Sequence, residues 1–374
     1  MARNLVVCCD GTANEFARNN TNVVKLYSVL CHDPDRQVAY YHPGLGTMEP
    51  AGTLTTFSRK LTKLLGMAFG FGLADDIRDA YVFLMSRYQP GDRVFLFGFS
   101  RGAYTVRAVA SLLHMYGLIR PGNEPLVPYA IRMLTGLKRS RAADQDEYFA
   151  FAREFKKAMS WTHCRPWFVG VWDTVSSVGW VENPLKLPHV TNNPDIEIGR
   201  HAVAIDERRA FFRTHLWWPP RDPSRPRGPK DLQQVWFPGV HCDVGGGYPE
   251  SESGLSKIAL GWMLDEAAAK GLLVDEGKRD AELGRGGDRA HTPPDARAAA
   301  HESLKGFWHV AEFAWKKHYD RATGREGRRM NLYRRRTIPP GALVHASAYE
   351  RGDAYRSRIP KDATRVGRVP GSEP

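Results

Sequence analysis

The amino-acid sequence predicts an α/β fold in which a mostly parallel β-sheet carries helices on both faces. The main observation is that short apolar runs alternate with segments of helical periodicity over the first 118 residues, as in sheets whose parallel strands are joined by helices. In addition, 42% of the 374 residues are hydrophobic, which is enough for a sizeable core. No apolar run approaches the roughly 20 residues that span a bilayer, so a membrane-embedded fold is not expected.

The first half of the chain alternates regularly. Short continuous apolar runs predict buried strands, and apolar residues that recur every three to four positions predict helices. A proline-glycine pair at 90–91 ends the second helix. On this basis we expect strands at 5–9, 37–41 and 93–97, helices at 23–30, 77–88 and 103–115, and an irregular insertion at 50–73.

The second half is less regular. Apolar runs predict two further core strands, 167–172 and, as the last one, 235–237, with a helix after them at 255–263. The remaining segments are polar, proline-rich or glycine-rich, and we expect lid-like insertions at 120–165 and 184–230 (the latter with one short helix near 206–212) and a loop at 275–300. The prediction is therefore a single domain, 1–374, with its core at about 1–118, 165–182 and 232–272 and a basic C-terminal region at 277–374.

The positive charge is concentrated in that C-terminal region. The formal net charge is +12, and residues 277–374 hold 21 Lys and Arg against 12 Asp and Glu, a balance of +9. The densest run is Arg334-Arg335-Arg336. A basic face of this kind can meet an anionic membrane surface or nucleic acid. We do not expect nucleic acid as the partner, and an ordinary solvated basic surface is the favoured interpretation.

The five cysteines bear on the compartment. Their number is odd, and their spacing fits neither a disulfide framework nor a zinc site. A reducing compartment is the simpler inference, so we expect cytoplasmic synthesis. The N-terminal apolar stretch is too short for a signal peptide, and any export would use a route without a cleaved leader.

A glycine-rich turn provides a candidate nucleophile. Gly98-Phe99-Ser100-Arg101-Gly102 matches the G-x-S-x-G pattern. Five residues alone are a weak signal, but here they join the strand 93–97 to the helix 103–115, which is the setting that this nucleophile elbow requires. The glycines let strand and helix approach closely around a strained serine. We predict that Ser100 is a nucleophile, with an ordinary glycine-rich turn as the alternative.

A serine hydroxyl needs a neighbouring base, here a histidine held by a carboxylate in the chain order serine, acid, histidine. Asp173 ends an apolar strand, where an acid projects from the carboxyl edge of the sheet; capping the next turn is its alternative role. Among thirteen histidines, His241 follows a late buried strand and lies in a glycine-flanked loop, whereas His201 and His215 are its rivals. We expect Ser100, Asp173 and His241 to form a triad.

Acyl transfer also needs two backbone N–H groups that stabilise the oxyanion. One is expected from Arg101, the residue after the nucleophile. The second is expected from the loop after the strand 5–9, two strand units upstream of the elbow strand, where Gly11 and Thr12 are both candidates. Asp10 can order this loop through local hydrogen bonds.

Other chemistries fit the same residues less well. Asp10 and the two residues after it resemble the end of an aspartate-nucleophile phosphatase motif, but the required first aspartate falls at Cys8. Asp10, His241 and Asp243 are conceivable metal ligands, yet there is no compact ligand motif such as H-E-x-x-H. No P-loop for nucleotides is present either. We therefore expect neither a metal nor a cofactor.

Several blocks of the sequence, in a fixed order over nearly the whole chain, resemble a known family. The family is the α/β-hydrolase catalytic domain of type VI secretion phospholipase effectors, long classified as a domain of unknown function. The order of the blocks makes the resemblance far more specific than the elbow alone. The matching segments are 7–12, 20–23, 41–47, 98–103, 172–175 and 239–248, with 338–345 resembling the closing region of the family.

The resemblance implies Ser100, Asp173 and His241 as the triad, and it implies lipase activity on phospholipid acyl esters. It also implies a secretion apparatus and an immunity protein as partners. We therefore predict a serine esterase or lipase that cleaves carboxylic esters through an acyl-enzyme. The alternative is a non-catalytic basic binding module on a hydrolase scaffold, because a fold does not fix a function.

Overall fold

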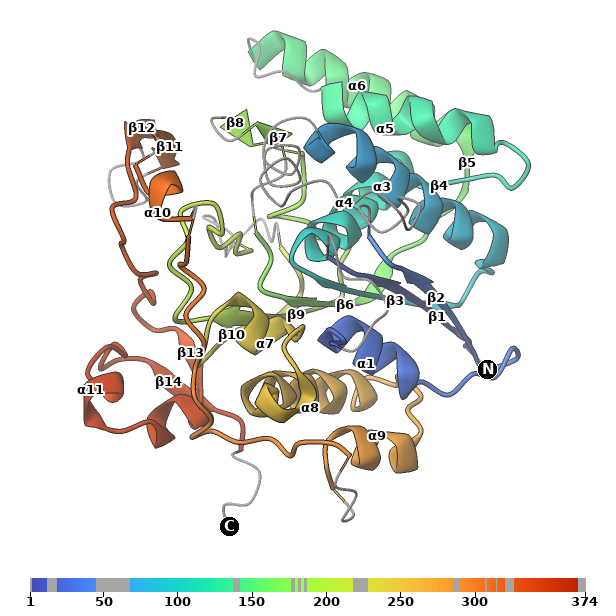
Figure 1. The fold of residues 1–374 in the computed structure, drawn as a ribbon. Coiled ribbons are helices and arrows are strands. Elements are labelled where there is room, and N and C mark those ends of the chain that lie inside the picture. The colour runs from blue at the N-terminus through green and yellow to red at the C-terminus, as the bar shows by residue number, and fades with distance from the viewer. Residues whose placement is uncertain are drawn as a thin grey trace, which may run out of the picture.

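The centre of the fold is an eight-stranded β-sheet whose neighbouring strands all pair in parallel (Figure 1). The structure is a computed structural model. It describes residues 2–11, 19–44, 68–136, 142–175, 179–180, 183–184, 187–217, 228–285, 290–306, 308–313, 315–319 and 326–368. In spatial order the strands are β2 (Gln37–His42), β1 (Asn4–Cys9), β3 (Arg93–Phe99), β6 (Pro166–Trp172), β9 (Ile198–Ala204), β10 (Asp231–Phe237), β13 (Leu343–His345) and β14 (Thr364–Val366).

Helices cover both faces of this sheet, which confirms the predicted α/β class (Figure 1). On one face lie α1 (Asn22–Ser28) and α8 (Gly254–Ala268), and on the other α3 (Ala68–Arg87) and α4 (Arg101–Tyr116). Further out on the second face are α5 (Val127–Gly136) and α6 (Ala142–Met159). The shorter helices are α7 (His241–Gly245), α9 (Glu276–Glu282), α10 (Trp308–Ala311) and α11 (Asp353–Arg356).

Burial on both faces explains the continuous apolar runs in the sequence. Successive side chains of a strand point to opposite faces. In β3, Val94 and Leu96 join the core beneath α3 and α4, whereas Phe95 and Phe97 join the core beneath α1 and α8. A strand with two buried faces has no polar alternation, so its sequence is an apolar run.

The strand order creates a switch point beside the elbow. The chain starts in β1, places β2 on one side of it and β3 on the other, and then continues outward from β3. At such a point the loops after the two central strands diverge, and ligands of open α/β sheets bind in the resulting crevice. Here the two loops are the turn that begins at Asp10 and the elbow at Ser100.

Two segments differ from the sequence-based expectation because polar residues interrupt their pattern. We expected 184–230 to be an insertion with a helix near 206–212, but β9 is a fully buried central strand and the described residues 206–212 are not helical. Arg200 and His201 interrupt the apolar run of this strand, so the sequence pattern did not predict it. The Arg200 guanidinium is neutralised by Asp231 and Glu266. Likewise, α9 lies within the expected loop 275–300.

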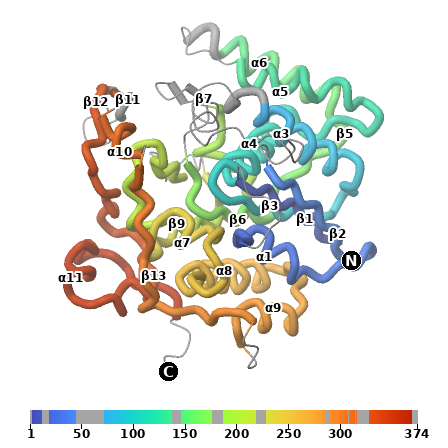
Figure 2. The backbone as a smooth tube through the Cα atoms, in the orientation of Figure 1, coloured from blue at the N-terminus to red at the C-terminus, as the bar shows by residue number. Residues whose placement is uncertain are grey.

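The C-terminal region is part of the sheet, so 235–237 is not the last core strand. β13 and β14 follow it, and a third apolar cluster that includes Trp236, Ile338 and Val344 joins them to β10. Figure 2 shows the chain leaving α9, rising to α10 and returning to β13. The expected insertion 50–73 overlaps the start of α3, and its residues 50–67 lie outside the described part of the chain.

The remaining elements are short. They are β4 (Leu118–Ile119) with β5 (Ser160–Thr162), β7 (Gly179–Trp180) with β8 (Asn183–Pro184), β11 (Lys316–Tyr319) with β12 (Glu326–Arg329), and the 3₁₀ turns Glu124–Leu126, Glu250–Glu252 and Ala346–Glu350. None of the helices in the described ranges is long and apolar enough to cross a bilayer. All five cysteines are free thiols.

The close approach of α4 to β1 generates a prediction about Gly102. A Cβ atom at this position would lie 2.1 Å from the carbonyl oxygen of Cys9 and 2.5 Å from that of Asp10, both of them backbone atoms. We expect Gly102→Ala to lower the free energy of unfolding by about 3 kcal/mol, at the upper end of overpacking costs. Gly277→Ala is the matched control, because Gly277 is exposed in α9 and its Cβ would meet nothing closer than 3.5 Å. Urea unfolding of both variants measures the difference, and equal stability would contradict the tight elbow packing.

Candidate active site

Ser100 has the backbone of a nucleophile elbow. It lies between the last residue of β3 and the first residue of α4, with φ 57° and ψ −116°. A side chain at this φ is strained, and such strain persists only where the surroundings fix it. Here the Ser100 N–H donates to the carbonyl of Trp172 at 3.1 Å, and a Cβ on Gly98 would lie 2.5 Å from the carbonyl oxygen of Gly102. The serine is half-buried at the N-terminus of a 16-residue helix, where the helix dipole favours developing negative charge.

The loop after β1 lies against this elbow, as the packing of Gly102 shows. Its Asp10 is ordered as we expected: Thr21 Oγ1 and Tyr41 OH donate to Asp10 Oδ2 at 2.6 and 3.0 Å. The Gly11 N–H donates to Asp10 Oδ1 at 2.7 Å, so this group is already engaged in the structure. Thr12, the other candidate donor to an oxyanion, lies outside the described residues. The choice between Gly11 and Thr12, and the donor role of Arg101, remain predictions.

Asp173 is a fully buried carboxylate at the end of β6. Its φ of 35° turns the chain, and its N–H donates to the Ala202 carbonyl at 2.7 Å. The Ala204 N–H donates to Oδ1 at 3.0 Å, and the Arg336 guanidinium donates to Oδ1 at 2.5 Å and to Oδ2 at 3.0 Å. Although burial by itself raises it, these partners and His241 hold the pKa of Asp173 well below its usual range. The group is therefore ionised at neutral pH.

The structure brings His241 to this carboxylate. The His241 Nδ1–H donates to Asp173 Oδ2 at 2.5 Å, and the ring packs against Phe99 and Phe212, with centroids 4.6 and 4.9 Å away. Burial lowers the pKa of His241, which the hydrogen bond to Asp173 only partly offsets. At neutral pH the ring is therefore neutral. Because Nδ1 carries the proton that is donated to Asp173, the free lone pair of the ring is on Nε2.

The link from His241 to the serine is the part that stays a prediction. Within the described chain His241 Nε2 has no hydrogen-bond partner, so it is not bonded to Ser100 Oγ here. The two residues are nevertheless near neighbours in the packing, because Phe99 precedes Ser100 and contacts the imidazole. Hydrogen bonds of a catalytic site are often long before substrate binds.

The rival histidines have other surroundings. His201 accepts the Thr174 N–H on Nε2 at 3.1 Å and meets Gln234 through Nδ1 at 3.3 Å. Burial lowers the pKa of His201 to about 3, so it is a neutral structural residue. His215 packs edge-on against Tyr104, and its backbone N–H donates to the Thr174 carbonyl.

Glu207 binds the backbone of residues 239–247, which we call the histidine loop, a role that the sequence did not reveal. It lies in the segment that we expected to be an insertion, and it accepts the His241 N–H at 3.2 Å. The Arg209 guanidinium binds both of its oxygens at 2.9 Å and lies 3.5 Å from the ring centre of Phe212. Although burial raises it, these bonds lower the pKa of Glu207 to about 2. The loop is therefore held by a carboxylate that is ionised at neutral pH.

Asp243, His301 and Glu252 form a second set of contacts that holds the histidine loop, and we call it the His301 clamp. Asp243 accepts the Val240 N–H at 2.9 Å and the His301 Nδ1–H at 2.6 Å, while His301 Nε2 meets Glu252 at 2.8 Å. The ring of Tyr248 stacks on the His301 ring at 3.6 Å. Burial alone lowers the pKa of His301, but the bonds to Glu252 and Asp243 raise it above its ordinary value. A protonated His301 donates to both carboxylates.

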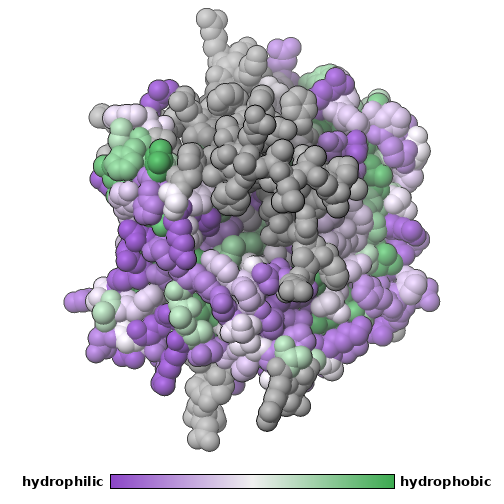
Figure 3. Space-filling view, in the orientation of Figure 1, coloured by the Kyte–Doolittle hydropathy of each residue, from purple (hydrophilic) through white to green (hydrophobic). Residues whose placement is uncertain are grey.

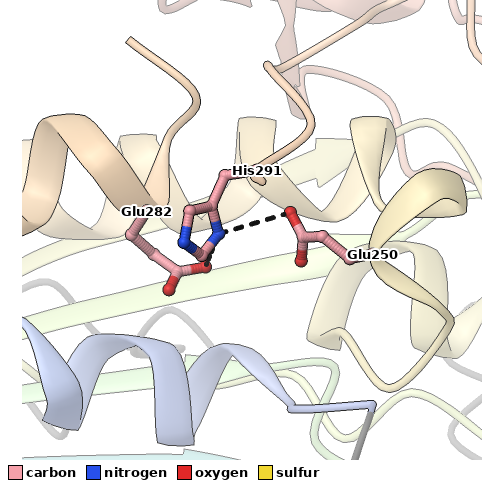
Figure 4. Close-up of side chains that lie close together, drawn as sticks. All are labelled: Glu250, Glu282 and His291. Carbon is pink, nitrogen blue, oxygen red and sulfur yellow. Dashed lines mark ion pairs between the residues drawn. The ribbon is translucent and has the colours of Figure 1, made fainter. Parts of the chain in front are cut away.

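One further cluster combines groups that could ligate a metal. Glu250, Glu282 and His291 point toward one another, with ligand atoms within 4.8 Å (Figure 4). However, Lys257 Nζ lies 2.9 Å from Glu250 and 2.5 Å from Glu282, and Lys25 Nζ lies 2.8 Å from Glu250. The two ammonium groups already neutralise both carboxylates, so the cluster is an ion-pair network that ties α1 to α8 and α9.

Comparison with known proteins identifies the family of the chain. Residues 3–266 match the family described as the phospholipase effector Tle1-like catalytic domain of the type VI secretion system, T6SS. The chain belongs to this family. Membership agrees with the α/β-hydrolase type of the fold. The region after residue 266, which contains Arg336, lies outside the match.

Individual relatives add little functional information. "Uncharacterized protein YEL023C" of Saccharomyces cerevisiae is 34% identical over 226 residues, which are 58% of this chain and 33% of that protein. The chain thus spans about a third of the length of this curated relative. A solved structure of an uncharacterized protein from Pseudomonas aeruginosa aligns with 74% of this chain and 47% of that chain, at 22% identity and a TM-score of 0.42.

The His301 clamp predicts a pH-dependent stability. Because the pKa of His301 is raised in the folded state, its contribution is complete below the unfolded value near 6.5 and is lost as the pH rises through the folded value. We expect His301→Gln to lower the melting temperature by roughly 1–3 °C at pH 6, with a penalty that shrinks toward pH 9. His309→Gln, an exposed histidine on the same C-terminal segment, is the control. A penalty for His301→Gln that does not change between pH 6 and pH 9 would refute the clamp.

Proposed function

We propose that the chain is a serine hydrolase that cleaves carboxylic esters, phospholipid acyl esters foremost, with Ser100 as nucleophile, His241 as base and Asp173 as its orienting acid. One observation carries the proposal: a strained serine at the switch point of the sheet neighbours a buried, neutral imidazole whose Nδ1 is held by a carboxylate and whose Nε2 is unpartnered within the described residues. A structural histidine normally satisfies both nitrogens, as His201 does.

The first half of the reaction acylates the serine. His241 Nε2 takes the proton of Ser100 Oγ as the oxygen attacks the ester carbonyl, and the tetrahedral oxyanion is held by the Arg101 N–H and by a second N–H from Gly11 or Thr12. Asp173 stabilises the imidazolium that forms. His241 then gives the proton to the leaving alcohol oxygen, and the C–O bond breaks. The product is an acyl-enzyme on Ser100.

The second half of the reaction hydrolyses the acyl-enzyme, with water in the place of the alcohol. His241 Nε2 takes a proton from water, whose oxygen attacks the acyl carbon, and the proton returns to Ser100 Oγ when the ester bond to the enzyme breaks. The protein supplies only orientation, a base and oxyanion donors, so these steps require no cofactor. We propose that residues 1–374 act as one domain, because β13 and β14 belong to the sheet that carries the site.

Covalent labelling tests the nucleophile. A fluorophosphonate probe should label the wild type at Ser100, should not label Ser100→Ala, and should label His241→Ala at least about 100-fold more slowly, because the base activates the serine. Peptide mapping by mass spectrometry locates the adduct. Equal labelling of the three proteins would remove the elbow from the active site, and an unreactive wild type would favour a non-catalytic binding module.

Family membership supports lipid as the substrate, and the structure corrects our view of which surface meets it. The basic C-terminal region suggested an anionic membrane partner, and the tryptophan pair at 217–218 would also suit such an interface. Trp217, however, is buried beneath the Arg107 guanidinium, 4.3 Å from the ring centre, and Trp218 lies outside the described residues. Arg336 is likewise not free to meet a membrane, because it binds Asp173.

Exposed apolar side chains gather instead around α10. We call Val310, Phe313, Trp315 and Leu332 the α10 surface; each is 48–66% exposed. Figure 3 shows an apolar patch at the corner where Figure 1 places α10, β11 and β12, amid hydrophilic surface. The surface adjoins the candidate site through two aromatic contacts, from Trp308 to Phe212 and from Phe212 to His241. Aromatic groups of this kind suit the membrane interface, and nearby arginines are attracted to anionic lipid.

Vesicle hydrolysis tests this surface. We expect phospholipid hydrolysis to rise when zwitterionic vesicles are doped with anionic lipid, and to fall again at high salt, because salt screens the attraction. In a Phe313→Ser/Trp315→Ser variant, the ratio of vesicle to soluble-ester hydrolysis should drop by roughly tenfold, which corresponds to about 1.4 kcal/mol of lost interfacial binding.

The matched control for the α10 surface is Phe151→Ser. Phe151 is 50% exposed, against 52% for Phe313, but it lies on α6, which Figure 1 shows apart from α10. It should leave the ratio unchanged. A protein that cleaves soluble esters and no vesicle phospholipid under any condition would retain the esterase assignment and lose the lipase assignment.

A further inference from the structure

We propose that Arg336 is a positioning residue of the active site: it holds the Asp173 carboxylate in the orientation in which it orders His241, and it sets the pH at which His241 loses its proton. The inference rests on the function proposed above for Ser100, Asp173 and His241. It concerns a residue far beyond the segment that matches the family.

Arg336 is fixed by four hydrogen bonds at its two terminal nitrogens. Nη1 donates to Asp173 Oδ1 at 2.5 Å and to the Ala204 carbonyl at 2.9 Å. Nη2 donates to Asp173 Oδ2 at 3.0 Å and to the Phe212 carbonyl at 2.5 Å. A planar guanidinium that binds both oxygens of a carboxylate fixes the carboxylate plane, which a single ammonium cannot do. Asp173 Oδ2, one of these oxygens, is the atom that accepts the His241 Nδ1–H.

The burial of this pair makes the arginine necessary. The side chain of Asp173 is 0% exposed and that of Arg336 is 9% exposed, so water contributes little to the stability of the charge. Without Arg336 the carboxylate would retain, among the described residues, only the Ala204 N–H and the imidazole as hydrogen-bond partners. An uncompensated buried carboxylate gains stability when a neighbour takes up a proton, and the nearest group that can do so is His241.

The charge balance therefore predicts how Arg336 acts on the base. With Arg336 present, the group of Arg336, Asp173 and neutral His241 carries no net charge, and protonation of His241 makes it positive. With Arg336 replaced by a neutral side chain, the same protonation would cancel a negative charge. The other charges that face His241 are Arg209 and Glu207, which lower and raise its pKa respectively, and they bind each other. With the guanidinium present, the imidazole thus stays unprotonated down to a lower pH than it would without Arg336.

The neighbouring arginine provides the control. Arg335 has the same side chain and the adjacent position, but it is 53% exposed, and among the described residues its ion-pair partner is Asp206, 4.0 Å away. The chain passes this site as it returns from β12 to β13 (Figure 2). Arg336 points inward to Asp173, and Arg335 points outward.

The test compares Arg336→Met, Arg336→Lys and Arg335→Met with the wild type in hydrolysis of a soluble short-chain ester across pH 5–9. For Arg336→Met we expect kcat to fall about 10- to 100-fold with little change in KM, and the acidic limb of kcat/KM to move up by about one pH unit. Arg336→Lys keeps the positive charge but loses the two-pronged guanidinium that binds both carboxylate oxygens. The acidic limb of its kcat/KM profile should therefore stay in place while kcat falls several-fold. Arg335→Met should match the wild type.

A readout without turnover separates this inference from the proposed function. The His241 ring can be titrated by NMR in a Ser100→Ala background, with and without Arg336→Met. An upward shift of its midpoint supports the role of Arg336 even if no ester is found to be a substrate. An unchanged midpoint, or wild-type kcat and pH profile in an active Arg336→Met enzyme, overturns it. If Arg336→Met does not fold, as melting curves would show, Arg336→Lys decides: wild-type kcat in that variant overturns the inference.

Discussion

The buried negative charge of Asp173 is the constraint on which the arrangement of the candidate site depends. An ionised carboxylate that is fully removed from water persists only where hydrogen bonds and an opposite charge replace the solvent. Its partners come from three separate stretches of chain: the end of β9, the loop after β10 and the segment before β13. One carboxylate therefore ties the central sheet to the histidine loop and to the C-terminal region, and the site cannot be complete without all of them.

The parallel sheet explains why these groups can meet. Every strand of a parallel sheet ends at the same edge, so residues that follow β3, β6 and β10 are brought together although they are far apart in sequence. The strand order then selects the position along that edge, because the switch point beside β1 leaves room above the elbow. The strained backbone of Ser100 is tolerated there since Gly98 and Gly102 permit contacts that no other residue could make.

This logic also separates what the sequence could predict from what it could not. Ser100, Asp173 and His241 could be selected as candidates because each follows a continuous apolar run, and such runs indicate burial on both faces of the sheet. β9 escaped detection because Arg200 interrupts its run, and its neutralising partners lie on other elements. Arg336 left no local signal at all: it stands in a run of three arginines, and only the fold distinguishes it from the exposed Arg335.

The position and the basicity of the imidazole are controlled by different groups. Glu207 and Asp243 bind backbone N–H groups of the histidine loop, and they fix where the ring stands. Asp173 acts at the ring itself and raises the proton affinity of His241, which burial opposes. Arg336 acts through Asp173, and by the charge balance proposed above it opposes protonation of the ring. A base that works near neutral pH needs this opposition, because only the neutral imidazole can accept the proton of the serine, and a higher proton affinity would leave less of it neutral. The basic C-terminal region, which composition alone presents as a solvated surface, thus contributes one arginine to the electrostatic balance on which the proposed chemistry depends.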